Sequence, residues 1–189
     1  MKVLDNWGVL ISQTGSEVIA ISEELGILPG LIVTNNITKI SPRNMEIFGE
    51  NNVEIHSLPR KPSIVDYLRT RINLKELITL HGYLRILPAD LFPYLQGAAY
   101  NGHPGLITVY PELKGFNKQE DVAGNQEKYP YCGSVVHKVI PELDAGEVVS
   151  AYQVVNRANT IDEAYAILRE TSLNSWIHFF TNIWKFDKK

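Results

Sequence analysis

Hydrophobic residues in the first hundred positions gather in short runs separated by segments with helical spacing. Each run is rich in apolar residues and lies close to Gly, Pro or Asn, which is typical of buried strands. Continuous runs, rather than strict alternation, indicate parallel strands covered on both faces. The predicted strands are residues 8–12, 31–34, 53–56, 77–80 and 98–101.

Segments with apolar residues three and four positions apart lie between these strands and near the end of the chain. They predict helices over residues 17–25, 63–72 and 160–186, the last interrupted near 171–172. Alternation of strand and helix is the signature of an open doubly wound sheet, in which ligands bind beyond the carboxyl ends of strands. We therefore expect a three-layer α/β/α Rossmann-like fold with a mostly parallel sheet, in one domain of residues 1–189.

The second half of the sequence adds a predicted hairpin and a polar stretch. Residues 134–140 and 148–155 are rich in β-branched residues and read as two paired strands. Residues 114–130 are polar with little periodicity, which predicts a loop or a short, poorly anchored helix. Its place between the two candidate site segments described below makes this stretch a candidate lid.

Composition and charge narrow the class of partner. The chain has 189 residues, of which 44% are hydrophobic, and its net charge of −3 gives no field that would attract nucleic acid or an anionic membrane. The single cysteine, Cys132, excludes an internal disulfide and a cysteine zinc cluster, and no apolar run approaches membrane-spanning length. We expect a cytoplasmic protein, monomer or homodimer, with small-molecule partners and neither nucleic acid nor membrane.

Three polar residues in two short segments carry the candidate chemistry. Asn101 and His103 lie in Asn-Gly-His-Pro, and Asp144 lies in Asp-Ala-Gly about forty residues later. An amine that attacks a carbonyl carbon builds negative charge on oxygen and positive charge on nitrogen. An imidazolium and an amide stabilise the negative charge, and a carboxylate removes the positive charge by accepting a proton from the amine. The trio therefore predicts acyl transfer to an amine.

Five ordered blocks of sequence, spread over nearly the whole chain, resemble the folate-dependent formyltransferase superfamily. Within it, the similarity is greatest to the members that formylate glycinamide ribonucleotide. The blocks are Val9-Leu10-Ile11-Ser12 with Gly15-Ser16; Leu80-His81-Gly82-Tyr83-Leu84-Arg85-Ile86-Leu87; Asn101-Gly102-His103-Pro104; Tyr110-Pro111; and Gly133-Ser134-Val135-Val136-His137 leading to Glu142-Leu143-Asp144-Ala145-Gly146.

The resemblance implies roles for residues of these blocks. Asn101 and His103 would stabilise the oxyanion formed when an amine attacks the formyl group of 10-formyltetrahydrofolate, and Asp144 would hold the imidazolium and relay the amine proton. It implies no metal. The residues implied around the pterin of this co-substrate are Arg85, Ile86, Leu87, Ile140, Glu142 and Leu143.

The same resemblance implies an acceptor site with two departures from the family pattern. Gly15 and Ser16 would bind the acceptor phosphate, and Glu170 would contact the acceptor. Glu17 stands where relatives have Asn and would repel a phosphate, while residues 105–108 replace Ser-Leu-Leu-Pro with Gly-Leu-Ile-Thr. The acceptor side is therefore expected to be remodelled more than the cofactor side.

Several readings of function stay open at this point. Glycinamide ribonucleotide, in purine synthesis, is the first-choice acceptor, with an amino-sugar nucleotide as the alternative. The same trio could instead activate water as a 10-formyltetrahydrofolate hydrolase, or the chain could be a non-catalytic folate-binding module. We expect Asp144 to raise the pKa of His103 and keep it cationic. The remaining histidines are interpreted as structural or surface residues: His56, His81, His137 and His178.

Overall fold

The computed structural model describes residues 1–58, 61–71, 76–95, 98–115 and 118–185, and for residues 61–64 and 118 the backbone alone. The chain divides into two compact units, residues 1–101 and residues 102–189. The boundary falls within one strand, between Asn101 and Gly102. The expectation of a single domain over residues 1–189 stays a prediction.

Five strands of the first unit form a parallel sheet. Their order is β3-β2-β1-β4-β5, and every neighbouring pair among them is parallel. All five correspond to predicted strands, although β1 and β2 both start earlier than their predicted runs. Their bounds are β1 Lys2–Ile11, β2 Ile27–Thr34, β3 Glu54–Ser57, β4 Leu77–His81 and β5 Ala99–His103.

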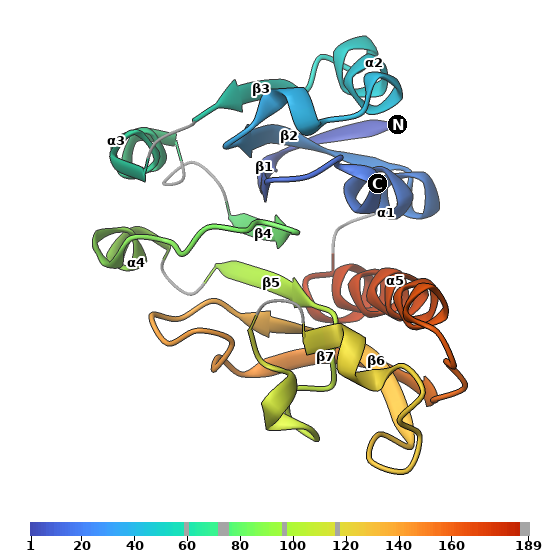
Figure 1. Ribbon diagram of the computed structural model, residues 1–189. Helices are drawn as coiled ribbons and strands as arrows, with labels where there is room; N and C mark the ends of the chain where they lie inside the picture. The colour runs from blue at the N-terminus through green and yellow to red at the C-terminus, as the bar shows by residue number, and fades with distance from the viewer. Residues whose placement is uncertain (59–60, 72–75, 96–97, 116–117, 186–189) are drawn as a thin grey trace. The chain divides into compact units, whose positions relative to one another are not determined.

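Helices cover both faces of this sheet, as a doubly wound fold requires. Figure 1 shows α1 (Ser16–Leu25) and α2 (Pro42–Glu50) on one face, with α3 (Lys61–Arg71) and α4 (Phe92–Leu95) on the other. The predictions for α1 and α3 are confirmed to within two residues at the described ends, while Ile72 lies outside the described residues. The layered α/β architecture is therefore confirmed.

Helix α2 is an element that the sequence reading missed. Its signals are present, since Ser41 caps the helix by accepting a hydrogen bond from the Asn44 amide at 3.3 Å, and Pro42 takes the first helical position. Only Asn44 and Phe48 are buried in it, so its apolar stripe is too narrow to stand out.

The second unit is built on an antiparallel hairpin and a long helix. Strands β6 (Tyr131–Lys138) and β7 (Val148–Val155) pair as predicted. Helix α5 (Ile161–His178) packs on both, and buried serines bond across the contact. The Ser134 hydroxyl donates to the Leu168 carbonyl at 2.9 Å, and the Ser175 hydroxyl donates to the Ser134 carbonyl at 2.9 Å.

The predicted interruption of the last helix is wrong. Thr171 and Ser172 are buried inside a continuous α5, where the Thr171 and Ser134 hydroxyls lie 3.0 Å apart. The helix instead changes at its end, to a π-helical turn over Phe179–Ile183. Phe186, the predicted last residue of this helix, lies outside the described residues.

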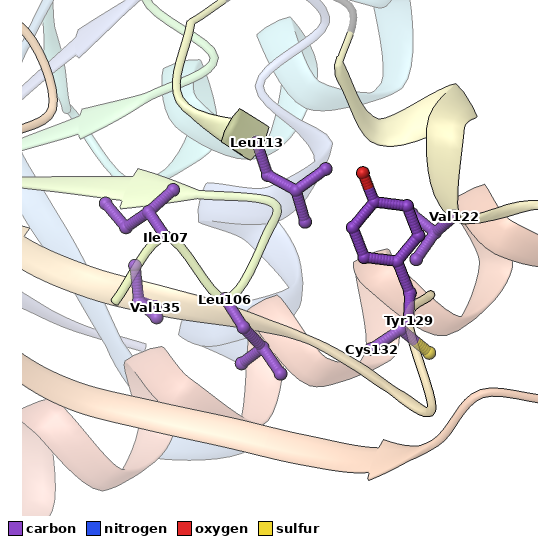
Figure 2. Close-up of a cluster of buried hydrophobic side chains, with 7 residues drawn as sticks. All are labelled: Leu106, Ile107, Leu113, Val122, Tyr129, Cys132 and Val135. Atoms are coloured by element: carbon purple, nitrogen blue, oxygen red, sulfur yellow. The ribbon is translucent and has the colours of Figure 1, made fainter. Parts of the chain in front are cut away.

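A buried apolar cluster anchors the segment between β5 and β6 (Figure 2). Two of its side chains come from the polar stretch of residues 114–130. Val122, at the end of the short helix Lys118–Val122, is 1% exposed, and Tyr129 is 0% exposed. The expectation of poor anchoring is therefore wrong. The cluster consists of Leu106, Ile107, Leu113, Val122, Tyr129, Cys132 and Val135.

Candidate active site

The two residues of the Asn-Gly-His-Pro segment that carry chemistry lie on β5. Asn101 and His103 are two positions apart on this strand, so their side chains point to the same face. Gly102 between them is required by packing, because a Cβ there would lie 2.6 Å from Nε1 of Trp176. The sequence thus presents an amide and an imidazole in series at the carboxyl end of a strand.

The imidazole of His103 is buried and lies between two oxygen atoms. Its Nε2 is 2.9 Å from the Leu113 carbonyl oxygen, and its Nδ1 is 3.4 Å from Oδ2 of Asp144. The side chains of His103 and Asp144 are only 6% and 8% exposed. The predicted convergence of these two groups, distant in sequence, is therefore observed.

Asp144 is held in place by an unusual backbone. It lies in the connection between β6 and β7 and has φ 49°, in the left-handed region that few residues other than Gly and Asn or Asp adopt. At Gly146 the chain passes so close to the Lys138 carbonyl that a Cβ would clash with it. The Gly115 amide donates to Oδ2 of Asp144 at 3.0 Å. Such strain is concentrated at functional sites.

A second histidine, which the sequence reading left as structural, joins this pair. Nε2 of His137, near the end of β6, lies 3.6 Å from Oδ1 of Asp144, and its Nδ1 lies 2.9 Å from the Lys138 carbonyl oxygen. The rings of His103 and His137 are 6.4 Å apart, edge to face. The available signal was its position in the same block as Asp144, at the end of a buried strand.

The two imidazoles share one carboxylate and face more acceptors than neutral rings can satisfy. Each ring has an oxygen near both nitrogens, whereas a neutral imidazole carries one N–H. The cluster can therefore take up a proton without moving any atom far. Within the part of the chain that the structure describes, no group of three or more His, Cys, Asp or Glu side chains is arranged to hold a metal ion.

Burial and charge act in opposite directions on this cluster. Burial alone would raise the pKa of Asp144, but the hydrogen bond from His137, the charge of His103 and the Gly115 amide outweigh it and hold that pKa below its usual value. Burial lowers the pKa of His103, and the opposing influence of Asp144 and of the Leu113 carbonyl is smaller. The expected rise in the pKa of His103 is therefore wrong, because burial outweighs the carboxylate.

The residues predicted to surround the co-substrate fall in both units. In the first unit, Arg85 is half-buried, Leu87 is buried and Ile86 is 66% exposed. In the second, Ile140 is half-buried, Glu142 is exposed and Leu143 is 63% exposed. Their role stays a prediction.

The predicted acceptor residues also lie apart in the chain. Gly15 has φ 77° and begins α1, and the Ser16 hydroxyl lies 2.9 Å from the Thr14 hydroxyl and accepts from Nδ2 of Asn44 at 3.3 Å. Glu170 lies exposed on α5. Contact of Gly15, Ser16 and Glu170 with an acceptor stays a prediction.

Comparisons with known proteins identify similar sequences. No family model matches the chain. It is 30% identical over 121 residues to the phosphoribosylglycinamide formyltransferase of Haemophilus influenzae, a match covering 64% of this chain and 51% of that protein. It is 31% identical over 88 residues to the trifunctional purine biosynthetic protein adenosine-3 of Bos taurus, covering 46% of this chain and 8% of that protein. The chain thus spans about half, or less, of the length of these curated relatives.

Solved structures show the fold over more of the chain. The phosphoribosylglycinamide formyltransferase from Anaplasma phagocytophilum has a TM-score of 0.74 at 26% identity, covering 90% of this chain and 82% of that one. The enzyme of the same name from Streptococcus pneumoniae has a TM-score of 0.76 at 20% identity, covering 96% and 99%. The predicted resemblance is confirmed, and the chain is similar in sequence and in fold to the phosphoribosylglycinamide formyltransferases.

Proposed function

We propose that the protein transfers the formyl group of 10-formyltetrahydrofolate to a primary amine, with glycinamide ribonucleotide, an intermediate of purine synthesis, as the acceptor to test first. The observation that carries this proposal is the buried contact of His103 with Asp144, 3.4 Å between Nδ1 and Oδ2. The names of the similar proteins support both the reaction and the acceptor.

The chemistry follows from the charges that the reaction creates. Attack of the amine on the formyl carbon places negative charge on the formyl oxygen, which donors from Asn101 and His103 stabilise. That developing charge opposes the burial that lowers the pKa of His103, so the ring takes up a proton from solvent as the oxyanion forms and returns it when the oxyanion collapses. The imidazolium is then stabilised by the Asp144 carboxylate.

Asp144 also has the properties of the group that accepts the amine proton. Its lowered pKa keeps it ionised at neutral pH, and its hydrogen bonds hold it in one position. As the tetrahedral intermediate collapses, the proton lost by nitrogen is balanced by the proton gained by the leaving nitrogen of tetrahydrofolate. His137, the second contact of Asp144, is placed to share that proton.

One contact must open during the reaction. The Nε2 hydrogen of His103 is directed at the Leu113 carbonyl, 2.9 Å away. For this nitrogen to donate to the substrate, the ring or the backbone at Leu113 has to shift, while the Leu113 side chain stays in the buried cluster of Figure 2.

The test is formyl transfer by the purified protein with glycinamide ribonucleotide, followed as release of tetrahydrofolate. His103→Ala should lower kcat by at least about a hundredfold, as for other single catalytic groups. His56→Ala is the matched control, because His56 is a partly exposed histidine paired with Glu54 in the first unit. It should keep full activity.

Three outcomes would overturn the proposal. Turnover of the His103→Ala protein at the rate of the unchanged protein would remove the imidazole from the mechanism. Consumption of the formyl co-substrate at the same rate without any amine would identify a hydrolase instead. Binding of the co-substrate with no turnover of any amine would identify a folate-binding module.

A further inference from the structure

Four side chains of the first unit, Trp7, Thr79, His81 and Glu17, form a hydrogen-bond relay that ends at Glu17. Nε1 of Trp7 donates to the Thr79 hydroxyl at 2.8 Å, the same hydroxyl lies 2.8 Å from Nε2 of His81, and Nδ1 of His81 lies 2.8 Å from Oε2 of Glu17. Trp7, Thr79 and His81 are at most 4% exposed, whereas the Glu17 side chain is 31% exposed.

The direction of each bond follows from what its atoms can do. The Trp7 indole only donates, so the Thr79 oxygen accepts from it. The Glu17 carboxylate only accepts when ionised, so Nδ1 of His81 carries a hydrogen. Between Nε2 of His81 and the Thr79 hydroxyl either atom can donate. In both cases the ionised Glu17 carboxylate accepts from His81 and lies at the exposed end of the relay.

This charge lies at the position where open α/β sheets bind ligands. In the order β3-β2-β1-β4-β5, the chain runs from β1 outward to β2 and β3, and then from β4 in the opposite direction to β5. The topological switch point, where the strand order reverses, therefore falls between β1 and β4. Ile11, the last residue of β1, is in register with His81, the last of β4. The loops that follow are tied together, because the Leu84 amide donates to the Ser12 hydroxyl at 2.9 Å.

The relay changes what the loop before α1 can bind. The Thr14 and Ser16 hydroxyls bond to each other at 2.9 Å, and the Ser16 amide donates to Thr14 Oγ1 at 3.3 Å, so these groups are already engaged. A fixed carboxylate beside them repels a phosphate dianion. It accepts hydrogen bonds from hydroxyl groups, as the acidic residue of dinucleotide-binding folds does with ribose.

We propose that Glu17, oriented by His81, binds a sugar hydroxyl of the acceptor, and that the acceptor phosphate lies elsewhere. This inference rests on the proposed function for the identity of the acceptor. The amine has to reach the formyl carbon unprotonated, which leaves the hydroxyl-bearing part of the acceptor for the carboxylate. Glu17 is then a specificity-determining residue, and His81 and Thr79 position it.

The indole N–H of Trp7 is a built-in reporter of this site. The chain has three tryptophans, so an amide-type NMR correlation spectrum shows three indole signals, and Trp7→Phe identifies the one that belongs to the relay. The full chain is titrated without co-substrate with three probes: glycinamide ribonucleotide, its dephosphorylated riboside, and inorganic phosphate. Glu17→Gln is the test variant and Glu24→Gln, on the exposed face of the same helix, is the control.

We expect the nucleotide and the riboside to shift the Trp7 signal, and phosphate alone to leave it unchanged. Glu17→Gln should weaken riboside binding at least about tenfold, the loss expected for a hydrogen bond to a charged group. Glu24→Gln should bind as the unchanged protein does. In turnover, Glu17→Gln should raise KM for the acceptor and leave kcat within about twofold, since it removes binding that is equal in the ground and transition states.

Three results would overturn the inference. These are a shift of the Trp7 signal by phosphate alone, tighter binding of the nucleotide to Glu17→Gln than to the unchanged protein, and no shift with any probe. Failure of the proposed function is separate. If the protein binds the riboside at this site but transfers no formyl group, the proposed function fails and the hydroxyl site stands. If it transfers the formyl group and Glu17→Gln leaves KM unchanged, the proposed function stands and the hydroxyl site fails.

Discussion

Among the residues that the structure describes, three buried histidines face a carboxylate, one in the first unit and two in the second, and their geometries differ. His81 meets Glu17 at 2.8 Å on one nitrogen and Thr79 at 2.8 Å on the other. His103 meets Asp144 at 3.4 Å, and His137 meets the same carboxylate at 3.6 Å. Glu17 lies in a regular helix, whereas Asp144 has a left-handed backbone.

The difference indicates two uses of the same pair of groups. A relay of short hydrogen bonds holds its terminal carboxylate in one orientation. A cluster with longer contacts, more acceptors than hydrogens and a strained backbone changes its protonation at lower cost. The first arrangement suits recognition and the second suits proton transfer, and four predictions test this contrast.

The largest expected effect is on turnover when the second-unit carboxylate is neutralised. Asp144→Asn should lower kcat by at least about a hundredfold, because the amide accepts no proton from the amine and does not stabilise an imidazolium. Asp90→Asn, at an exposed position, is the control and should be fully active. Equal loss of kcat in Glu17→Gln would show that the two carboxylates are not used differently.

The next effect is on stability, when the first-unit relay is cut. Thr79→Val removes the acceptor of the Trp7 indole and the partner of His81, and should lower the free energy of unfolding by about 1–3 kcal/mol, the cost of unsatisfied buried groups. Denaturant titration measures it, with exposed Thr108→Val as the control. A folded Thr79→Val protein should keep its kcat, and a hundredfold loss there would contradict the assignment of the relay to recognition.

A smaller effect separates the two histidines of the second unit. His137→Gln keeps a polar side chain but loses the proton that His137 can share with Asp144, and should lower kcat by about tenfold, less than His103→Ala. The pH dependence of kcat should also move, since the pKa of Asp144 rises when the hydrogen bond from His137 is lost. A loss of stability with an unchanged pH profile would identify a purely structural residue.

The smallest effect is on the pH dependence of stability. The pKa of His103 is lowered in the folded state. Below a pH of about 6.5 the unfolded chain therefore binds a proton at this histidine more readily than the folded chain does, and the free energy of unfolding falls as pH falls. The slope from this one group is at most about 1.4 kcal/mol per pH unit. Urea titrations between pH 5 and 8 measure it, and His103→Gln should flatten the curve. A free energy of unfolding that rises as pH falls below about 6.5 would contradict the lowered pKa of His103.

Much of the fold and part of the site were readable from local sequence. Apolar runs predicted the five parallel strands of the first unit, and the hairpin of β6 with β7 was predicted from β-branched runs. The motifs around His103 and Asp144 identified a pair that the structure brings together. These features depend on residues close in sequence, or on motifs whose residue types have one common chemistry.

The rest depended on contacts that no local pattern records. Glu17 and His81 are 64 positions apart, and Trp7 and Thr79 are 72 apart, so neither pair leaves a periodic signal. The Leu113 carbonyl and the Gly115 amide belong to the backbone, which every residue carries. His137 has no motif of its own beyond its place before Asp144.

The sequence by itself determined the strand and helix segments and the chemical groups available to the site. Only the tertiary structure decided how those groups behave, because their pKa values and hydrogen-bond directions depend on burial and on partners brought together by folding. His103 illustrates the point, since its neighbours in sequence predict a raised pKa and its depth in the fold lowers it. Glu17, read from sequence as a charge that would repel a phosphate, is held by His81 in an orientation that no local pattern predicts.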